Sequence, residues 1–174
     1  MAVLKHMRTI KGFITIFSFV LAVAVTAAAQ INLTAVDGTR VDIEGQRGKV
    51  VVLAVGASWL PLSGKQAEYT NALAKKYTGN DVMFFFVATD STKAGSKNFA
   101  SDDAIQKFAF ANKLGMPVLR DSDGASILRR FKIEQVPSFV ILDKNGVMVG
   151  EPFGGIDPKY DLTIPISKTI DKVL

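Results

Sequence analysis

The feature that most constrains this chain is a six-residue apolar run that stops abruptly and is followed by a helical pattern. Val50 to Val55 is rich in β-branched side chains, which predicts a strand buried on both faces of a sheet. Gly56-Ala57-Ser58 interrupts the run, and Tyr69, Leu73 and Tyr77 then recur at every fourth position, as on one face of a helix. The turn between them is expected at the strand's carboxyl end, where α/β proteins usually hold their functional sites.

The neighbouring segments predict a mixed sheet. Val82 to Ala88 is a second apolar run, and the helix between the two runs makes a right-handed βαβ unit with parallel strands. Upstream, Ile31 to Glu44 alternates apolar and polar residues around Asp37-Gly38, which predicts a β-hairpin. These patterns together indicate an α/β fold.

The rest of the chain is predicted to alternate short strands and helices. The expected elements are a helix from Asp102 to Gly115, a strand at 116–119, a turn at 121–124 with a helix after it, a hairpin of strands 138–142 and 147–149, and a closing helix from Pro165 to Leu174. No regular structure is expected for residues 153–164.

Two segments carry a resemblance to a known family. The turn reads Trp59-Leu60-Pro61-Leu62-Ser63, and residues 136–146 read Val-Pro-Ser, an apolar strand and Asp-Lys-Asn-Gly. These segments resemble the Trp-Cys-x-x-Cys and Val-Pro-Thr, strand, Asp-x-x-Gly patterns of the thioredoxin-like (redoxin) thiol–disulfide oxidoreductases. The resemblance covers roughly residues 31–155. It implies a thioredoxin-like fold, with a central mixed β-sheet flanked by helices and an N-terminal β-hairpin. It also implies a cis peptide bond before Pro137, facing the turn.

The residues that carry the family's chemistry are absent. Leu60 and Ser63 stand where the family has its two cysteines, the chain contains no Cys, and its only His is His6. Thiol–disulfide exchange, thiolate-based peroxide reduction, Cys/His zinc sites and Ser-His-Asp hydrolysis all need one of these side chains. No dithiol oxidoreductase activity is therefore expected, and no catalytic residue, metal ligand or cofactor is assigned.

The first 29 residues have the organisation of a secretory signal peptide. A basic start is followed by a mostly apolar run at 12–25 and by small residues at 26–29. We therefore predict a signal peptide at 1–29 and one thioredoxin-like domain at 30–174, located in the periplasm or secreted. An uncleaved membrane anchor is the alternative, because the run is close to the lower limit of about 17 residues for a span.

The net charge gives no indication of nucleic-acid binding. The formal charge is +5, but Lys5, Arg8 and Lys11 lie in the predicted signal peptide. Without these three, the chain has 18 basic and 16 acidic residues, so its formal net charge is +2. The high isoelectric point thus owes much to the predicted export signal.

Ser63 is the first candidate functional residue. It lies near a helix N-terminus, where its hydroxyl could hold the thiol of a bound ligand, as in some glutathione-binding relatives. Alternatively, Ser63 and Gln66 form a capping pair at the start of the helix. Capping is favoured, because Ser63 has no neighbouring base and capping is a common use of serine.

Other candidates also have ordinary explanations. Leu60 either offers an apolar contact to an extended peptide or packs locally against Trp59 and Pro137. Trp59 and Tyr69 either line a groove or belong to the core, and core packing is favoured. The Asp121-Ser122-Asp123-Gly124 segment resembles part of a calcium loop but fits a turn better. The basic residues Arg129, Arg130 and Lys132 are interpreted as a solvated helix face.

Two functional hypotheses follow from these observations. In the first, the protein is an exported, non-redox module that binds peptides or proteins through a groove at Val136 and Pro137. Its role would then be chaperone-like toward exported proteins, or regulatory toward an active redox paralogue. In the second, it is a glutathione-dependent oxidoreductase or transferase in which Ser63 holds the ligand's thiol. Neither hypothesis involves nucleic acid, and a membrane is involved only through an uncleaved N-terminal segment.

Overall fold

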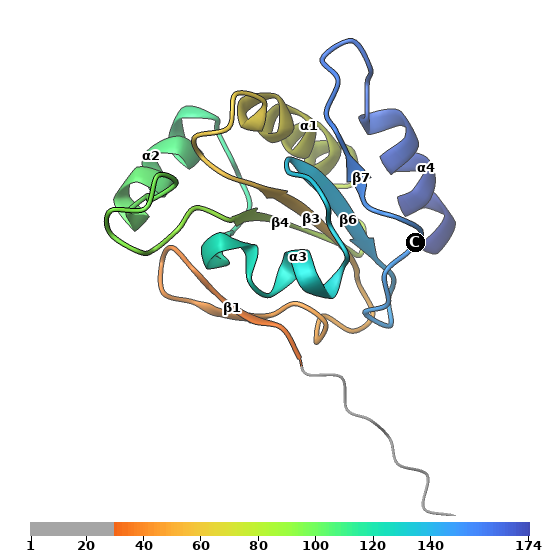
Figure 1. Ribbon diagram of the computed structural model, residues 1–174. Coiled ribbons are helices and arrows are strands. Elements are labelled where there is room, and N and C mark those ends of the chain that lie inside the picture. Colours follow the sequence, from red (N-terminus) through yellow and green to blue (C-terminus); the bar gives the residue numbers. More distant parts are fainter. Residues whose placement is uncertain (1–29) are drawn as a thin grey trace, which may run out of the picture.

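The computed structural model describes residues 30–174; the predicted signal peptide lies outside the described residues. Seven strands form one sheet in the order β2-β1-β5-β4-β3-β6-β7 (Figure 1). The strands are β1 (Asn32–Ala35), β2 (Arg40–Asp42), β3 (Val50–Gly56), β4 (Val82–Ala88), β5 (Val118–Arg120), β6 (Ser138–Leu142) and β7 (Phe153–Gly154). The helices are α1 (Ser63–Lys76), α2 (Asp102–Ala111), α3 (Ile127–Arg130) and α4 (Thr163–Val173), with a 3-10 turn, η1 (Ser122–Gly124).

The sheet is mixed, as predicted. Strands β3, β4 and β5 are parallel, whereas β6, β7, β1 and β2 pair antiparallel with their neighbours. Every residue of β3 is buried, because this strand lies at the centre of the sheet and is covered on both faces. The predicted N-terminal hairpin is formed by β1 and β2. These observations confirm the α/β, thioredoxin-like architecture inferred from the sequence.

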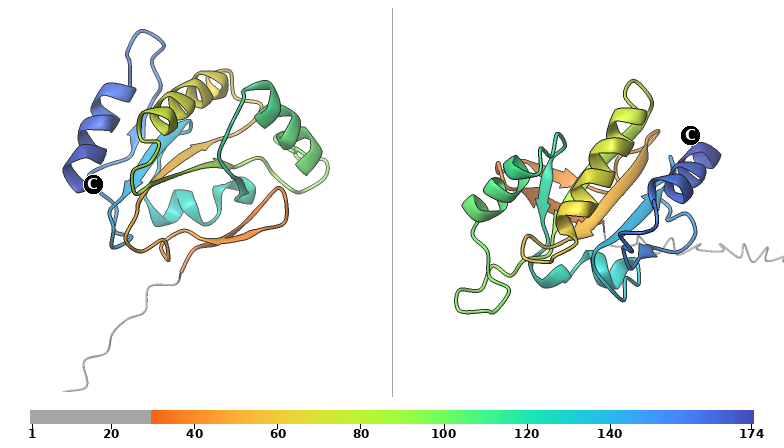
Figure 2. Two further views of the ribbon diagram at one scale, coloured as in Figure 1. Left: turned by 180° about the vertical axis from the view of Figure 1, so that it is seen from behind. Right: turned by 90° about the horizontal axis from the view of Figure 1, so that it is seen from above.

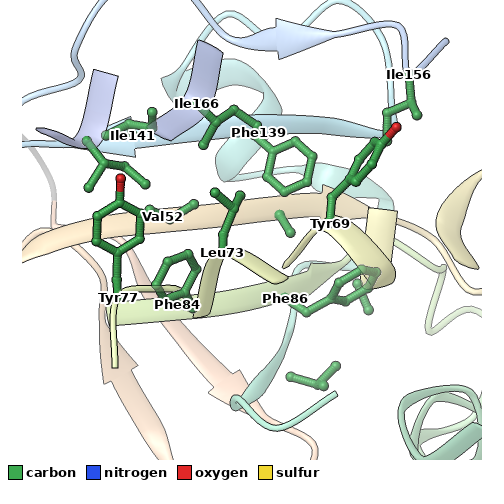
Figure 3. Packing of buried hydrophobic residues seen from close by; sticks show 14 of the residues in the cluster. Val52, Tyr69, Leu73, Tyr77, Phe84, Phe86, Phe139, Ile141, Ile156 and Ile166 are labelled. Atoms are coloured by element: carbon green, nitrogen blue, oxygen red, sulfur yellow. The ribbon is translucent and has the colours of Figure 1, made fainter. Parts of the chain in front are cut away.

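Helices cover both faces of the sheet. Helices α1 and α4 lie side by side on one face, and α3 lies on the other (Figures 1 and 2). The side chains of Tyr69, Leu73 and Tyr77 point from α1 onto the sheet, among Phe84, Phe86, Phe139 and Ile166 (Figure 3). The four-residue spacing read from the sequence therefore marks the buried face of α1.

The hairpin predicted after β6 is formed, although its returning strand is very short. Residues 147–149 pair antiparallel with the end of β6 through a bridge between Met148 and Leu142, and backbone hydrogen bonds join Asp143 to Val147 (2.8 Å) and Val149 to Ile141 (2.8 Å). The Asp143 side chain closes the turn, because it accepts hydrogen bonds from the backbone N–H groups of Asn145 (2.8 Å) and Val147 (2.9 Å). Further along, β7 continues the same edge of the sheet, with Phe153 opposite Phe139, in a segment for which no regular structure was expected.

Two other element boundaries are shifted from their predicted positions. Helix α2 ends at Ala111, before Gly115, because Lys113 adopts a left-handed conformation (φ 53°) and the Asn112 amide donates to the carbonyl of Phe108. Strand β5 begins at Val118, two residues later than expected. Among residues 30–174, no helix is both long enough and apolar enough to cross a membrane.

Candidate functional site

The turn between β3 and α1 is held in place by a buried carboxylate. Asp90, which follows β4, is fully buried and accepts hydrogen bonds from Ser58. The Ser58 N–H lies 3.0 Å from one carboxylate oxygen, and the Ser58 Oγ lies 2.6 Å from the other. Such charge-assisted bonds are stronger than neutral ones, so Asp90 fixes where the Trp59–Ser63 turn begins.

Asp90 was not predicted to be a site residue. The available signal was an acidic residue almost directly after an apolar strand, at the edge of the sheet where sites are expected. Its partner Ser58 lies 32 residues away in the chain, so only the fold brings the two together.

Gln66 connects the turn to the segment that contains Pro137. Its Nε2 donates to the carbonyl oxygens of Val55 (3.1 Å) and Ser138 (2.8 Å), at the adjacent ends of β3 and β6. The predicted capping pair of Ser63 and Gln66 is therefore wrong. Gln66 is fully buried and points at the sheet, whereas the helix N-cap is Leu62 and makes no side-chain capping bond.

Ser63 is the first residue of α1 and is fully buried. Its Oγ has no hydrogen-bond partner among the described residues, and it lies on the side of Gly56, where an added Cβ would be 3.3 Å from it. A ligand thiol could reach this hydroxyl only if the turn moved. The burial therefore gives no support to the glutathione hypothesis.

The residues before Ser63 face outward. Trp59 is 57% exposed and Pro61 is exposed, while Leu60 and Leu62 are half-buried. The preferred assignment of Trp59 to the core is therefore wrong. Its position in the turn between β3 and α1 places it beyond the last residue of β3, where its side chain is not covered. Tyr69, by contrast, is buried on α1, and its hydroxyl donates to the carbonyl of Tyr160, so the core assignment is confirmed for this residue.

The second segment lies beside the turn. The Val136–Pro137 peptide bond is cis, and the pairing of Ser138 with Val55 places this bond next to the end of β3. Pro137 is buried and Val136 half-buried. The backbone N–H and C=O of Val136 form no hydrogen bond with any other residue in the described part of the chain. The structure thus brings together the two segments that sequence analysis placed in one site, and it leaves Val136 unpaired.

The remaining candidates have structural roles. Asp121 accepts hydrogen bonds from the N–H groups of Ser126 and Ile127 and so caps α3. Asn98, Ser91 and Ser122 bind Asp123, and the Asn98 amide, together with the two hydroxyls, lowers the pKa of its carboxyl. Residues 30–174 contain no group of three or more His, Cys, Asp or Glu side chains that could hold a metal ion.

The basic run after η1 lies at the surface, as predicted. Arg129 and Lys132 are exposed. Arg130 is also exposed and pairs with Glu44, whose carboxylate lies 2.6 Å from the guanidinium.

Comparison with known proteins identifies the family. The sequence profile of the redoxin family matches residues 22–159, which is most of the chain. The chain belongs to the redoxin family. Among curated proteins, it is 25% identical over 127 residues to the thiol–disulfide oxidoreductase ResA of Bacillus cereus, covering 73% of this chain and 68% of ResA.

Solved structures show the same fold. The exposed lipoprotein thioredoxin Etrx1 of Streptococcus pneumoniae superimposes with a TM-score of 0.65 at 24% identity, covering 83% of this chain and 99% of Etrx1. A secreted disulfide oxidoreductase of Mycobacterium tuberculosis gives a TM-score of 0.63 at 23% identity, covering 82% of this chain and 96% of that protein.

This redoxin keeps the scaffold of the family's site without its thiols. The turn, the helix N-terminus and the cis-proline segment are all in place, but Leu60 and Ser63 occupy the cysteine positions and the chain contains no Cys. A hydrocarbon and an unactivated hydroxyl cannot exchange disulfides. What remains in the two segments of the site is the exposed aromatic side chain of Trp59 and the unpaired backbone of Val136.

Proposed function

We propose that this redoxin is an exported, non-redox protein that binds extended segments of other polypeptides across Val136 and the Trp59–Ser63 turn. The observation that carries the proposal is the unpaired backbone of Val136, a half-buried residue next to the end of β3. An extended peptide can satisfy such N–H and C=O groups by adding a strand, a mode of recognition that uses the backbone and needs no cysteine.

The exposed side of the turn supports the same role. Trp59 offers a large aromatic surface to solvent, and Leu60 follows it with a half-buried aliphatic side chain. Aromatic residues are enriched at protein-binding surfaces, because they bury much area at a low cost in side-chain entropy. Backbone pairing combined with apolar contact favours unfolded or extended partners over one particular sequence. The role is accordingly chaperone-like toward exported proteins, or regulatory toward an active redox paralogue.

Export is part of the proposal and rests on residues 1–29. Their basic, apolar and small-residue regions follow the order of a cleavable signal, and two structural relatives are a secreted protein and an exposed lipoprotein. Residue 30 would then begin the mature chain in the periplasm or outside the cell. Fractionation with N-terminal sequencing tests this directly. A chain that begins at residue 30 in the envelope or secreted fraction is expected, and an intact N-terminus in the membrane fraction would indicate an anchor.

Peptide binding tests the groove. Fluorescein-labelled extended peptides and a permanently unfolded, carboxymethylated protein are titrated with the domain, and binding is followed by anisotropy. Val136→Pro removes the donor N–H and is expected to weaken binding about tenfold, the equivalent of one to two backbone hydrogen bonds. Val136→Ala, which keeps the N–H, is the matched control and is expected to bind nearly as well as wild type.

A second variant tests the apolar side of the groove. Leu60→Asp places a charge beside Trp59 and is expected to weaken binding without changing the circular dichroism spectrum. This variant also covers the case in which Val136→Pro fails to fold. Unchanged binding in both variants, or no binding by the wild-type domain, would rule out the proposed groove.

A further inference from the structure

A cavity adjoins the cis-proline segment on the α3 side of the sheet. It has a volume of about 420 Å³, within the range of about 300–1,000 Å³ that is usual for ligand sites. Its walls are the segment 132–135, which leads to Val136, together with Glu151, Pro152 and Gly154 at the edge that contains β7. Ser138, the residue after Pro137, completes the lining.

The hydroxyl of Ser138 is buried and unpaired. Side chains alternate across a strand, and Phe139 belongs to the core on the α1 face, so the side chain of Ser138 points to the opposite face, toward the cavity. Ser138 is fully buried, and its Oγ has no hydrogen-bond partner in residues 30–174. Burial without a partner is costly for a hydroxyl, and a polar group bound in this cavity would relieve that cost once the atoms that cover the Oγ move aside.

Two glycines shape the wall that faces Gln135. A Cβ added to Gly154 would lie 3.0 Å from the Gln135 Nε2, and one added to Gly155 would lie 2.9 Å from the same atom. The end of the Gln135 side chain therefore lies close against residues 154–155 and would have to shift if either position carried a side chain. Its amide adds hydrogen-bonding capacity to the wall of the cavity.

The charges around the cavity are unbalanced. Glu134 and Glu151 line it together with a single base, Lys132, and all three are exposed. None of the three takes part in an ion pair with another described residue. The net charge of −1 favours a cationic occupant.

The cavity also lies where a bound peptide must pass. Its lining includes Gln135 and Ser138, which flank the Val136–Pro137 pair, so a strand paired with Val136 is expected to run along its rim. Alternate side chains of such a strand point to one side, which allows one of them to enter the cavity. We infer that this cavity accepts a lysine or arginine side chain of the bound polypeptide, so that the preferred partners are basic segments. This inference rests on the proposed peptide-binding function.

The test uses one host peptide with Lys, Gln or Glu placed at successive positions. The Lys peptide is expected to bind about fivefold more tightly than the Gln peptide in low salt at one position, the scale of two weak ion pairs, and this preference should shrink as salt rises. The double variant Glu134→Gln/Glu151→Gln should lose the preference. Glu68→Gln, which removes an exposed carboxylate on α1, is the matched control and should retain it.

Ser138→Ala provides an independent measurement. Removal of an unpaired buried hydroxyl is expected to leave the free domain as stable as wild type or more so, yet to weaken binding of the Lys peptide. Equal binding of all three peptides, a preference for Glu, or a Lys preference that survives in the double variant would overturn the inference while leaving the groove intact. If no peptide binds, the proposed function and this inference both fail.

Discussion

The two halves of this site, the Trp59–Ser63 turn and the Val136–Pro137 segment, differ in what they retain of the family's site. In the turn after β3, the family's function depends on two side chains, and both positions now hold residues that cannot carry a thiolate. In the Val136–Pro137 segment, the proposed recognition depends on the backbone of Val136, a half-buried residue whose N–H and C=O are unpaired within the described chain. Chemistry that resides in a side chain is lost by a single substitution. Recognition through the backbone is kept for as long as the fold presents it.

The sharpest way to test this comparison is to restore the missing side chains. If the turn has kept its geometry, the double variant Leu60→Cys/Ser63→Cys should gain disulfide reductase activity, from none above background to a measurable rate. The first thiol would lie half-buried before the helix, and the second at its N-terminus. Insulin reduction with dithiothreitol measures the gain, and each single variant is a control that should remain inactive. A folded but inactive double variant would show that the scaffold itself has changed.

The side chain of Gln66 connects the two halves of the site, and a substitution there tests how much this connection stabilises the domain. Gln66→Ala removes both amide hydrogen bonds, to the Val55 and Ser138 carbonyls, and opens a small cavity. The free energy of unfolding is expected to fall by about 2–3 kcal/mol. Urea denaturation followed by the fluorescence of Trp59, the only tryptophan, measures it.

Glu68→Ala, an exposed change two residues further along α1, is the control for Gln66 and should cost no more than about 0.5 kcal/mol. Equal losses in both variants would mean that Gln66 does not hold the two halves together.

A smaller effect is expected at Ser63. Its hydroxyl is buried without a partner, so Ser63→Ala should stabilise the domain by about 1 kcal/mol. Thermal unfolding of the variant beside the wild type measures the change. Ser167→Ala, a change at another buried serine, on α4, is the control for the loss of a hydroxyl. If Ser63→Ala instead destabilises the domain by a similar amount, the hydroxyl makes a hydrogen bond in the folded state. Ser63 would then again be a candidate for contact with a ligand.

The smallest effect concerns pH and the turn after β6. Hydrogen bonds from the backbone N–H groups of Val147 and Asn145 lower the pKa of Asp143 below its usual value of 3.8. Because the folded-state pKa is below the unfolded one, this carboxylate stabilises the fold above about pH 4, and its contribution disappears as the pH falls through the folded-state value. Urea midpoints between neutral and acidic pH should therefore fall less steeply in Asp143→Asn than in wild type.

The control for Asp143 is Asp81→Asn. Asp81 is exposed, and its carboxylate accepts no hydrogen bond from another residue of the described chain. Identical pH slopes in wild type and Asp143→Asn would contradict the assignment of this effect to Asp143.

Much of the fold was predictable because its signals are local. Val50–Val55 and Val82–Ala88 are apolar throughout, and both form central strands. The turn at 143–146 and the antiparallel return of residues 147–149 to β6 were also predicted, because the turn signal is local. Strand β7 was not predicted, since its two residues are too few to show a strand pattern.

The candidate site was predictable in part. The resemblance placed Trp59–Ser63 beside Val136–Pro137, and the structure has them together. The exposure of Trp59 and the roles of Asp90 and Gln66 were not foreseen. Asp90 bonds to a residue 32 positions away and Gln66 to one 72 positions away, and no pattern along the chain shows which polar atoms will meet.

The sequence by itself determined which reactions are closed to this protein, because a chain without cysteine cannot move electrons through thiols in any conformation. It also determined the order of strands and helices, since the hydrophobic period that directs each element is local. Only the tertiary structure decided which polar groups found partners. The carboxylate of Asp90 and the amide N–H groups of Gln66 bond to distant parts of the chain, whereas the amide oxygen of Gln66, the backbone of Val136 and the hydroxyl of Ser138 have no partner among the described residues. That distinction arises from packing, and the proposed binding of peptides rests on it.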